Sequence, residues 1–266
     1  MSLKIGFIGY GNMGQAIADG LVRSGKALPQ NILVTDVDEE KKAVATKMGF
    51  VTTSSSRQIA KKADVLMLAV KPNQCATVIA DLQEAISEAT IVVSIAAGVK
   101  IATLEGYFAK PVKVVRTMPN TPVMVQAGMT AVVPNERLNS ADIRLVSELF
   151  LAIGRVEVVD EALIDAVIVT SGSAPAYVYM LIEAMINGGI AEGMPREMAT
   201  RFAAQAVYGA AKMVMQTESA PNDLREAVCS PGGTTIEAVK YLNDNQFGNI
   251  VQGAMKACAK RSKEMS

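Results

Sequence analysis

Near its start the chain places three glycines between a strand-like segment and a helical pattern. Residues 4–8 are rich in apolar and β-branched side chains, Gly9, Gly11 and Gly14 follow in the spacing GxGxxG, and residues 16–22 have helical periodicity. The first glycine of such a turn permits a tight bend, the second a close approach of backbone to a phosphate, and the third close packing of helix on strand. The sequence therefore predicts an α/β sheet that binds a dinucleotide.

The first part of the chain repeats this alternation of apolar runs and helical patterns. Such alternation is typical of βαβ units and a mostly parallel sheet. The predicted strands are residues 3–8, 32–35, 65–69, 91–94, 112–115, 130–133 and 154–158. A helical stretch, residues 141–151, precedes the last of them.

After Asp160 the strand-like runs stop, and Ala, Met, Ile and Tyr recur at helical spacing through Met215. We therefore expect a dinucleotide-binding domain over residues 1–161 and an all-helical domain over residues 162–266. These helices are apolar on more than one face, which favours packing against another subunit, although a simple buried core would give the same pattern. Gly188 and Gly189 are expected to break one of the helices.

Charge and composition exclude several classes of binding partner. Lys plus Arg equals Asp plus Glu at 26 each, with no basic run among aromatic residues, so we expect no nucleic-acid partner. The apolar runs 65–70 and 91–99 are too short to span a membrane. Cys75, Cys229 and Cys258 lack metal-ligand spacing, so we expect no metal site and a reducing, cytoplasmic location.

The chain contains no histidine. This excludes general acid catalysis by histidine, Ser-His triads and most zinc sites. Any proton transfer must therefore use another group or come from the substrate.

Asp36 follows the second predicted strand, where an acidic side chain accepts hydrogen bonds from a ribose 2′-hydroxyl. Its charge would repel a 2′-phosphate, which favours NADH over NADPH. Two alternatives stay open: Asp36 only starts the next helix, or Lys41 and Lys42 still reach a phosphate. The predicted cofactor is therefore NADPH or NADH, with Asp36 favouring NADH.

A second glycine turn, Ser230-Pro231-Gly232-Gly233, runs into the helical pattern Ile236, Val239, Leu242. Such a turn leaves backbone N–H groups unpaired at a helix start, where a carboxylate can bind. The alternative is an ordinary helix entry, in which Thr234 and Glu237 form a capping box.

Six blocks of this sequence resemble the pyrroline-5-carboxylate reductase family, and the resemblance covers essentially the whole length. The blocks are residues 5–14, 68–72, 94–98, 116–122, 171–177 and 230–235. The resemblance implies an N-terminal Rossmann-like domain and an all-α C-terminal dimerisation domain, in a homodimer or higher homo-oligomer. It also implies an enzyme for the last step of proline biosynthesis, the NAD(P)H-dependent reduction of 1-pyrroline-5-carboxylate to L-proline.

The resemblance further implies the residues that bind the cofactor, which lie in the glycine turn and at the ends of strands. They are Gly9, Tyr10, Gly11, Asn12, Met13, Gly14, Asp36, Ser56, Ala69, Val70, Lys71, Pro72, Ala97, Met118, Pro119 and Asn120. Many members of the family have Asn at the position of Ser56, so this chain departs from the pattern there.

The implied substrate-binding residues are Ser230, Gly232, Gly233, Thr234, Thr235 and Glu218. In this assignment Thr235 is catalytic, with its hydroxyl close to the ring nitrogen of the substrate. Glu218, an isolated acidic residue, also fits a solvated surface position. A cyclic imine can arrive already protonated, which accounts for a reductase without histidine.

Three other functions share some of these features. A β-hydroxyacid dehydrogenase has a similar two-domain plan, but such enzymes resemble one another in a catalytic lysine, and this chain has no lysine between Lys113 and Lys212. A reductase of another cyclic imine that lacks an acid group would not need the carboxylate-binding turn at residues 230–235. A nucleotide-sensing module would need only the first glycine turn.

Overall fold

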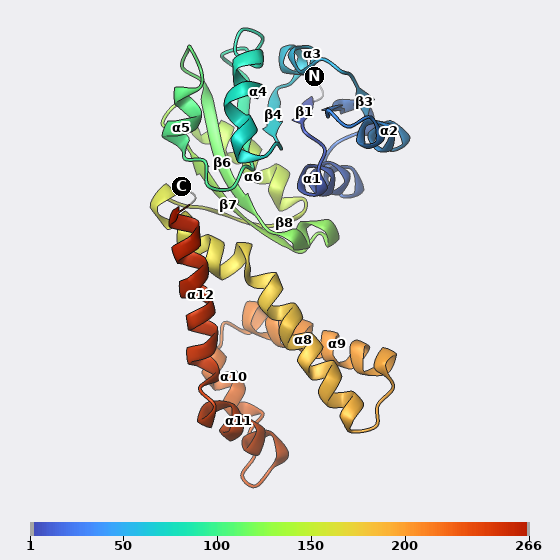
Figure 1. The fold of residues 1–266 in the computed structure, drawn as a ribbon, viewed down its shortest axis with the longest axis vertical. Coiled ribbons are helices and arrows are strands. Elements are labelled where there is room, and N and C mark those ends of the chain that lie inside the picture. Colours follow the sequence, from blue (N-terminus) through green and yellow to red (C-terminus); the bar gives the residue numbers. More distant parts are fainter. Residues whose placement is uncertain (1–2, 265–266) are drawn as a thin grey trace. The chain divides into compact units, whose positions relative to one another are not determined.

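The computed structural model describes residues 3–264, which divide into two compact units (Figure 1). One runs to Gly172 and includes the chain from Ala259 onward, and the other is Ser173–Cys258. The first unit thus extends past the boundary expected at residues 161 and 162. Ile164 explains this, because it is buried against Ala131 and Val133 of the sheet and takes the following turn with it.

Over residues 3–264 the first unit contains an 8-stranded sheet with the order β3-β2-β1-β4-β5-β6-β7-β8. The strands are β1 Ile5–Ile8, β2 Ile32–Thr35, β3 Val51–Thr52, β4 Val65–Leu68, β5 Ile91–Ser94, β6 Lys113–Pro119, β7 Gly128–Pro134 and β8 Gly154–Val158. The first six strands stand in the order of a doubly wound dinucleotide-binding fold. All seven predicted strands are present, and only the two-residue β3 was not predicted.

One neighbouring pair departs from the parallel pattern. β6 and β7 are antiparallel, with Pro119 opposite Thr130, whereas β7 and β8 are parallel again. The reason is the short connection between β6 and β7, which holds the 3₁₀ turn η3 (Thr121–Val125). A parallel pair needs a crossover of a dozen or more residues, so this chain can only turn back.

Helices cover both faces of the sheet (Figure 1). Buried side chains of α1, α2 and α6 form one core with strand residues such as Phe7 and Met67, and those of α3, α4 and α5 form the other with Leu66 and Leu68. The helices of this unit are α1 Asn12–Arg23, α2 Glu39–Lys47, α3 Ser56–Lys62, α4 Cys75–Leu82, α5 Ile101–Gly106, α6 Ser140–Leu151 and α7 Ile164–Val167. Short turns complete it: η1 Pro29–Asn31, η2 Pro72–Gln74, η4 Glu161–Leu163 and the π-helical η5 Ile168–Gly172.

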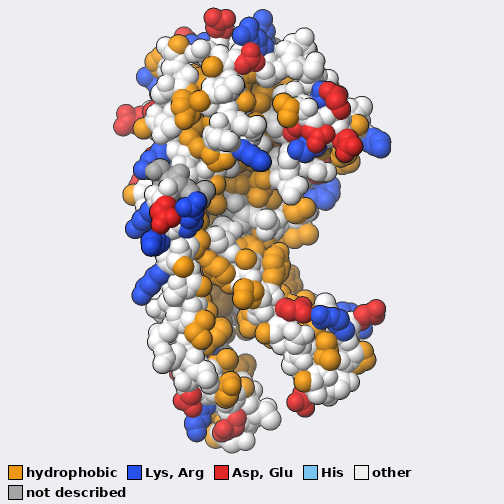
Figure 2. Space-filling model, in the orientation of Figure 1, with side chains coloured by type: hydrophobic (Ala, Val, Ile, Leu, Met, Phe, Trp, Pro, Cys, Tyr) orange, Lys and Arg blue, Asp and Glu red, His pale blue; other side chains and the backbone are white. Residues whose placement is uncertain are grey.

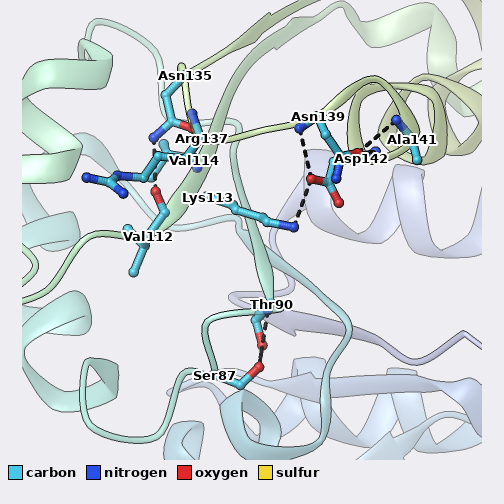
Figure 3. Close-up of polar contacts among 10 residues, drawn as sticks. All are labelled: Ser87, Thr90, Val112, Lys113, Val114, Asn135, Arg137, Asn139, Ala141 and Asp142. Atoms are coloured by element: carbon cyan, nitrogen blue, oxygen red, sulfur yellow. Dashed lines mark hydrogen bonds and ion pairs between the residues drawn. The ribbon is translucent and has the colours of Figure 1, made fainter.

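The start of β6 is held by polar contacts (Figure 3). The ammonium of Lys113 lies 2.8 Å from the carboxylate of Asp142, which also accepts a hydrogen bond from the N–H of Asn139. On the neighbouring turn, the amide of Asn135 accepts the N–H of Val114 and donates to a backbone carbonyl. These contacts fix the register of the strand whose other end reaches the candidate site.

The second unit is helical and contains α8 Ala174–Ala191, α9 Arg196–Thr217, α10 Pro221–Ala227, α11 Thr234–Asp244 and most of α12 Phe247–Glu264. The expected break at Gly188 and Gly189 is wrong, because α8 runs through both. A Cβ built on Gly189 would lie 3.3 Å from the Cβ of Ala199 on α9. Gly189 therefore permits close packing of two helices rather than ending one.

This helical unit exposes many large apolar side chains (Figure 2). Its buried cluster is small and centres on Ile186, Ala199 and Ala203. Exposed on α8 and α9 are Val178, Tyr179, Met180, Leu181, Met185, Ile190, Met198, Phe202, Tyr208, Met213, Val214 and Met215. The expectation of helices that are apolar on more than one face is thus confirmed, and the described chain itself leaves these faces uncovered.

The helical stretch Glu161–Ala191 has a length of 31 residues, a mean hydropathy of 1.2 and a share of 11% buried inside the chain. By length and composition alone it could cross a membrane, whereas the runs 65–70 and 91–99 are too short to do so. A single such helix is weak evidence, since a helix that packs against another subunit has the same composition.

Gly20 gives a test of how closely α1 packs against Ile153 in the core of the first unit. Alanine usually stabilises a helix interior relative to glycine, but a Cβ at Gly20 would lie 2.5 Å from Cγ2 of the fully buried Ile153. We expect Gly20→Ala to lower the free energy of unfolding by about 1–3 kcal/mol in urea titrations. Gly106→Ala is the control, because nothing lies within 4 Å of its Cβ, and it should raise stability by about 0.5 kcal/mol. Equal effects of the two substitutions would contradict the packing argument.

Candidate active site

The candidate site begins where the strand order reverses around β1. The N–H of Gly9 donates to the carbonyl of Thr35 on the β2 side, and the N–H of Ala69 donates to Ile8 on the β4 side, both at 2.8 Å. The chain then leaves the sheet in opposite directions on the two sides of β1. Open α/β sheets bind ligands in the crevice that this reversal creates.

A cleft of about 680 Å³ lies at this point. Its lining includes seven residues predicted to bind the cofactor, namely Gly9, Gly11, Asp36, Ser56, Ala69, Val70 and Lys71. Lys41 and Lys42, the alternative phosphate ligands, also line it. The lining also includes Ser54, Gln74 and Val78, which were not predicted. Ser54 follows the short strand β3, and because that strand was not predicted, the residue after it was not recognised as a strand end.

The glycine turn has the geometry that its spacing predicts. Gly9 has a φ of +96°, and a Cβ there would lie 2.5 Å from the carbonyl oxygen of Ala69. A Cβ on Gly14 would lie 2.9 Å from the carbonyl oxygen of Gly9, whereas Gly11 has nothing within 4 Å. Gly11 is also the N-cap of α1, with no side-chain hydrogen bond and no acidic residue in the first turn. The open backbone and free N–H groups suit a pyrophosphate.

Tyr10 supports this turn from inside the protein. Its side chain is 1% exposed, its ring meets Phe50 edge to face, and its hydroxyl donates to Asp19 of α1 at 2.8 Å. Burial, and then the Asp19 carboxylate, raise the pKa of the Tyr10 phenol. The ring therefore anchors the turn in the core and leaves only the backbone to meet a ligand.

Three other residues of the turn, Asn12, Met13 and the buried Gly14, lie outside the cleft lining. Asn12 is exposed and faces a small hollow with Asp19 and Arg23. Met13 is half-buried against the core of the first unit.

Asp36 is held by the backbone on both sides. One carboxylate oxygen accepts the N–H of Tyr10 at 2.6 Å and the other accepts the N–H of Asp38 at 2.9 Å, while Lys41 lies 3.9 Å away. The alternative that Asp36 merely starts a helix is wrong, because the N-cap of α2 is Asp38, which accepts the N–H of Glu40. Asp36 thus connects the end of β2 to the glycine turn and lines the cleft.

Ser56 takes part in a polar group on the far side of the cleft. Its hydroxyl donates to the carboxylate of Asp81 at 2.6 Å, and Arg57 donates to the other oxygen at 2.9 Å. The hydrogen bond from Ser56, together with Arg57, lowers the pKa of Asp81. The Ser56 hydroxyl therefore keeps only acceptor capacity for a ligand, which suits a ribose hydroxyl better than a phosphate.

The remaining predicted cofactor residues lie outside the cleft lining. Parallel pairing aligns Leu68 of β4 with Ser94 of β5 and Arg116 of β6. Ala97, which follows β5, and Met118 and Pro119, the last two residues of β6, therefore lie at the same edge of the sheet. Ala97 is exposed beside Gly98, and Pro72 starts η2 after Lys71. Asn120 is 9% exposed, and its side chain bonds to the protein itself.

The predicted substrate residues lie in the second unit. Gly233 donates its N–H to the carbonyl of Ser230 at 3.0 Å, and Gly232 has a φ of +68°, as in a turn of type II. The capping box of Thr234 and Glu237 is wrong, because the N-cap of α11 is Gly233 and no side chain caps it. Thr234 and Thr235 are both exposed in the first turn of the helix. The free N–H groups there leave a seat for a carboxylate.

Glu218 ends α9. It is the C-cap, with a left-handed φ of 56°, and its side chain is exposed. Glu218 and the turn at Ser230 both belong to the second unit, whereas the cleft belongs to the first unit.

Other features of the described chain carry none of the predicted residues. A larger hollow of about 1030 Å³ lies beside α5, lined by side chains such as Glu105, Arg137 and Glu161, and it contains no part of the glycine turn. Among residues 3–264, no group of three His, Cys, Asp or Glu side chains is placed to hold a metal ion.

Comparisons with known proteins match the two parts of the chain to two different family models. A family model described as pyrroline-5-carboxylate reductase dimerisation matches residues 161–265, and one described as NADP oxidoreductase coenzyme F420-dependent matches residues 4–98. The chain is 44% identical to pyrroline-5-carboxylate reductase of Escherichia coli over 100% of its own length and 99% of that protein.

Solved structures give the same result. A pyrroline-5-carboxylate reductase from Coxiella burnetii is 37% identical with a TM-score of 0.93, covering 100% of this chain and 99% of that one. The Plasmodium falciparum pyrroline carboxylate reductase with NADP bound is 30% identical with a TM-score of 0.90, covering 99% and 98%. Full-length identity and a shared fold identify the family. This chain belongs to the pyrroline-5-carboxylate reductases.

Proposed function

We propose that this protein reduces 1-pyrroline-5-carboxylate to L-proline with NADPH or NADH, the last step of proline biosynthesis. The observation that supports the proposal is the full-length match to the family, which spans both the part of the chain with the cleft and the part with the Ser230 turn. Mixing the protein with reduced nicotinamide dinucleotide and pyrroline-5-carboxylate should lower the nicotinamide absorbance. No loss of absorbance with either nucleotide would refute the proposal.

The proposed cofactor site is the cleft and the neighbouring strand ends. Gly11 and the first turn of α1 would hold the pyrophosphate, and Asp36 and Ser56 would meet the adenosine ribose. Ala69 to Pro72, Ala97 and the end of β6 at Met118 to Asn120 would line the nicotinamide side. A bound nicotinamide supplies the hydride, and the protein supplies orientation.

The proposed substrate site is the turn from Ser230 to Thr235 with Glu218. The free N–H groups at the start of α11 would bind the substrate carboxylate, and the Thr235 hydroxyl would face the ring nitrogen. Because a cyclic iminium already carries its proton, the enzyme needs no neutral-pH acid, in keeping with the absence of histidine. Most of the rate enhancement would then come from holding the two reactants in near-attack geometry.

Asp36 tests the cofactor preference. We expect Asp36→Ala to shift the ratio of kcat/KM values towards NADPH by about 5- to 150-fold, on the order of 1–3 kcal/mol, because the substitution removes a negative charge beside the 2′ position. Both KM values should rise, since the Tyr10 N–H loses its acceptor. Asp38→Ala is the control, as it removes an equal charge that caps α2 but does not line the cleft. An unchanged ratio in Asp36→Ala would show that Asp36 only supports the glycine turn.

Thr235 tests the catalytic assignment. Thr235→Ala should lower kcat/KM about tenfold, equivalent to about 1.4 kcal/mol, with nicotinamide affinity preserved. Thr234→Ala is the matched control, because its proposed contact uses the backbone N–H. Neither hydroxyl caps α11, so the melting temperatures of both variants should stay near that of the unmodified protein. Wild-type kcat/KM in Thr235→Ala would remove that hydroxyl from the mechanism.

We further propose that the protein is a homodimer or higher homo-oligomer through its second unit. The dimerisation family model and the exposed apolar faces of α8 and α9 support this. Another copy of the chain would also cover the apolar stretch Glu161–Ala191.

Three free cysteines support a cytoplasmic location.

Phe202 on α9 tests the interface, since its side chain is 64% exposed. We expect Phe202→Glu to give monomers in light scattering, because a buried unpaired charge destabilises an apolar interface. Leu28→Glu, an equal change at an exposed apolar residue of the first unit, should leave the oligomer intact. A monomeric unmodified protein, or an unchanged oligomer in Phe202→Glu, would argue against this interface.

A β-hydroxyacid dehydrogenase is the weaker second candidate. It is disfavoured because the chain has no lysine between Lys113 and Lys212, and α8, at the start of the second unit, therefore offers none to act on an alcohol.

A further inference from the structure

The side chain of Asn120 joins three segments of the first unit. Asn120 directly follows β6, its Oδ1 accepts the N–H of Met129 on β7 at 2.9 Å, and its Nδ2 donates to Ser171 of η5. The contacts to the carbonyl oxygen and the hydroxyl of Ser171 measure 3.3 Å and 3.2 Å. Ser171 is 51 residues further along the chain, so this is a tertiary contact and not a local turn.

The segment that Asn120 holds is unusual. η5 is a π-helical turn, and π-helical turns occur mostly as single insertions that are frequent at functional sites. η5 also lies against β6, because a Cβ on Gly172 would come within 2.8 Å of the terminal methyl of Met118. Asn120 and Met118 therefore fix one edge of η5 at the carboxyl end of β6.

This arrangement leaves the Asn120 amide little capacity for a ligand. The residue is 9% exposed, its donor group is directed to Ser171, and its acceptor already receives a backbone N–H. A ligand that accepted a hydrogen bond from the Asn120 Nδ2 would have to replace a contact to Ser171. We therefore expect Asn120 to affect the reaction mainly through the segments that it holds.

We propose that Asn120 is a positioning residue that sets the end of β6 against η5 and thereby fixes the backbone at Met118 on the nicotinamide side. The inference rests on the proposed function, which places that strand end beside the reacting groups. Displacements of about 1 Å in such supporting segments can lower rates by about 100-fold. Asn120 lies outside the glycine turn and the cleft lining, where the pyrophosphate and the adenosine ribose would bind, so those parts of dinucleotide binding should depend on it less than turnover does.

Asn120→Asp is the test variant. It keeps an acceptor for the Met129 N–H but places a carboxylate oxygen beside the Ser171 carbonyl, where the amide had donated. We expect kcat to fall roughly tenfold or more while the KM for the dinucleotide changes less than about threefold, measured well below the melting temperature. Asn139→Asp is the matched control, because Asn139 also bonds to backbone N–H groups, at the start of α6, and aspartate can replace it as a cap. This control should retain wild-type kcat and KM.

A pH series separates positioning from a general loss of stability. Burial and the nearby carbonyl raise the pKa of the introduced carboxyl, and its protonated form can donate a hydrogen bond as the amide does. The ratio of variant to wild-type kcat should therefore rise as the pH falls, whereas the same ratio for Asn139→Asp should stay flat. Dividing the kcat of the variant by that of the wild type at each pH removes the effect of substrate titration. The chain also has no histidine whose titration could add a second pH dependence.

The outcomes distinguish the inference from the proposed function. A wild-type protein that reduces no pyrroline-5-carboxylate overturns the proposed function, and the inference with it. An active wild type with an Asn120→Asp variant that melts earlier but keeps kcat overturns the inference alone. If Asn120→Asp does not fold, Ser171→Ala removes only the hydroxyl partner and should lower kcat roughly threefold with the dinucleotide KM retained. An unchanged kcat in Ser171→Ala would then count against the positioning role.

Discussion

The close approach of α1 to the β1 and β4 strand ends is the constraint on which the candidate site depends. There is no room for a side chain at Gly9 or Gly14, since a Cβ on either would meet backbone atoms within 3 Å. That contact brings the first turn of α1 to the reversal point of the sheet, where its unpaired N–H groups open beside Gly11. Asp36 and the buried Tyr10 then hold the turn in place from two sides. A looser turn would lose both the open N–H groups beside Gly11 and the close contact of helix and strand.

The two units differ in how much of their apolar surface they bury within the chain. The sheet unit covers both of its faces with its own helices, and side chains such as Phe7 and Leu68 are almost fully buried. The helical unit buries only a small cluster around Ile186 and leaves α8 and α9 largely apolar and exposed. Apolar surface of this extent is stabilised when another surface covers it. The dimerisation domain that matches these residues supplies a reason why the chain retains them.

The proposed chemistry suits a chain without histidine. The Ser230 turn offers backbone N–H groups and two hydroxyls, and the cleft offers an open backbone with carboxylate and hydroxyl groups around it. Fixed dipoles of this kind bind and orient charged reactants without changing their own protonation. An imine that carries its own proton needs no more than this from the enzyme, whereas a ketone would require an acid.

Sequence alone determined the features that depend on local periodicity and glycine geometry. The strands, the glycine turn and the helical second part are all encoded within a few residues, where side-chain alternation and freedom at positive φ act directly. Tertiary structure decided the rest. The direction of β7 came from the shortness of η3, and the cap of α11 from the backbone of Gly233 rather than the side chain of Thr234. The carboxylate of Asp36 and the amide of Asn120 found partners 26 and 51 residues away. Such partners depend on how distant segments meet in the folded chain, and no local pattern of residues carries that information.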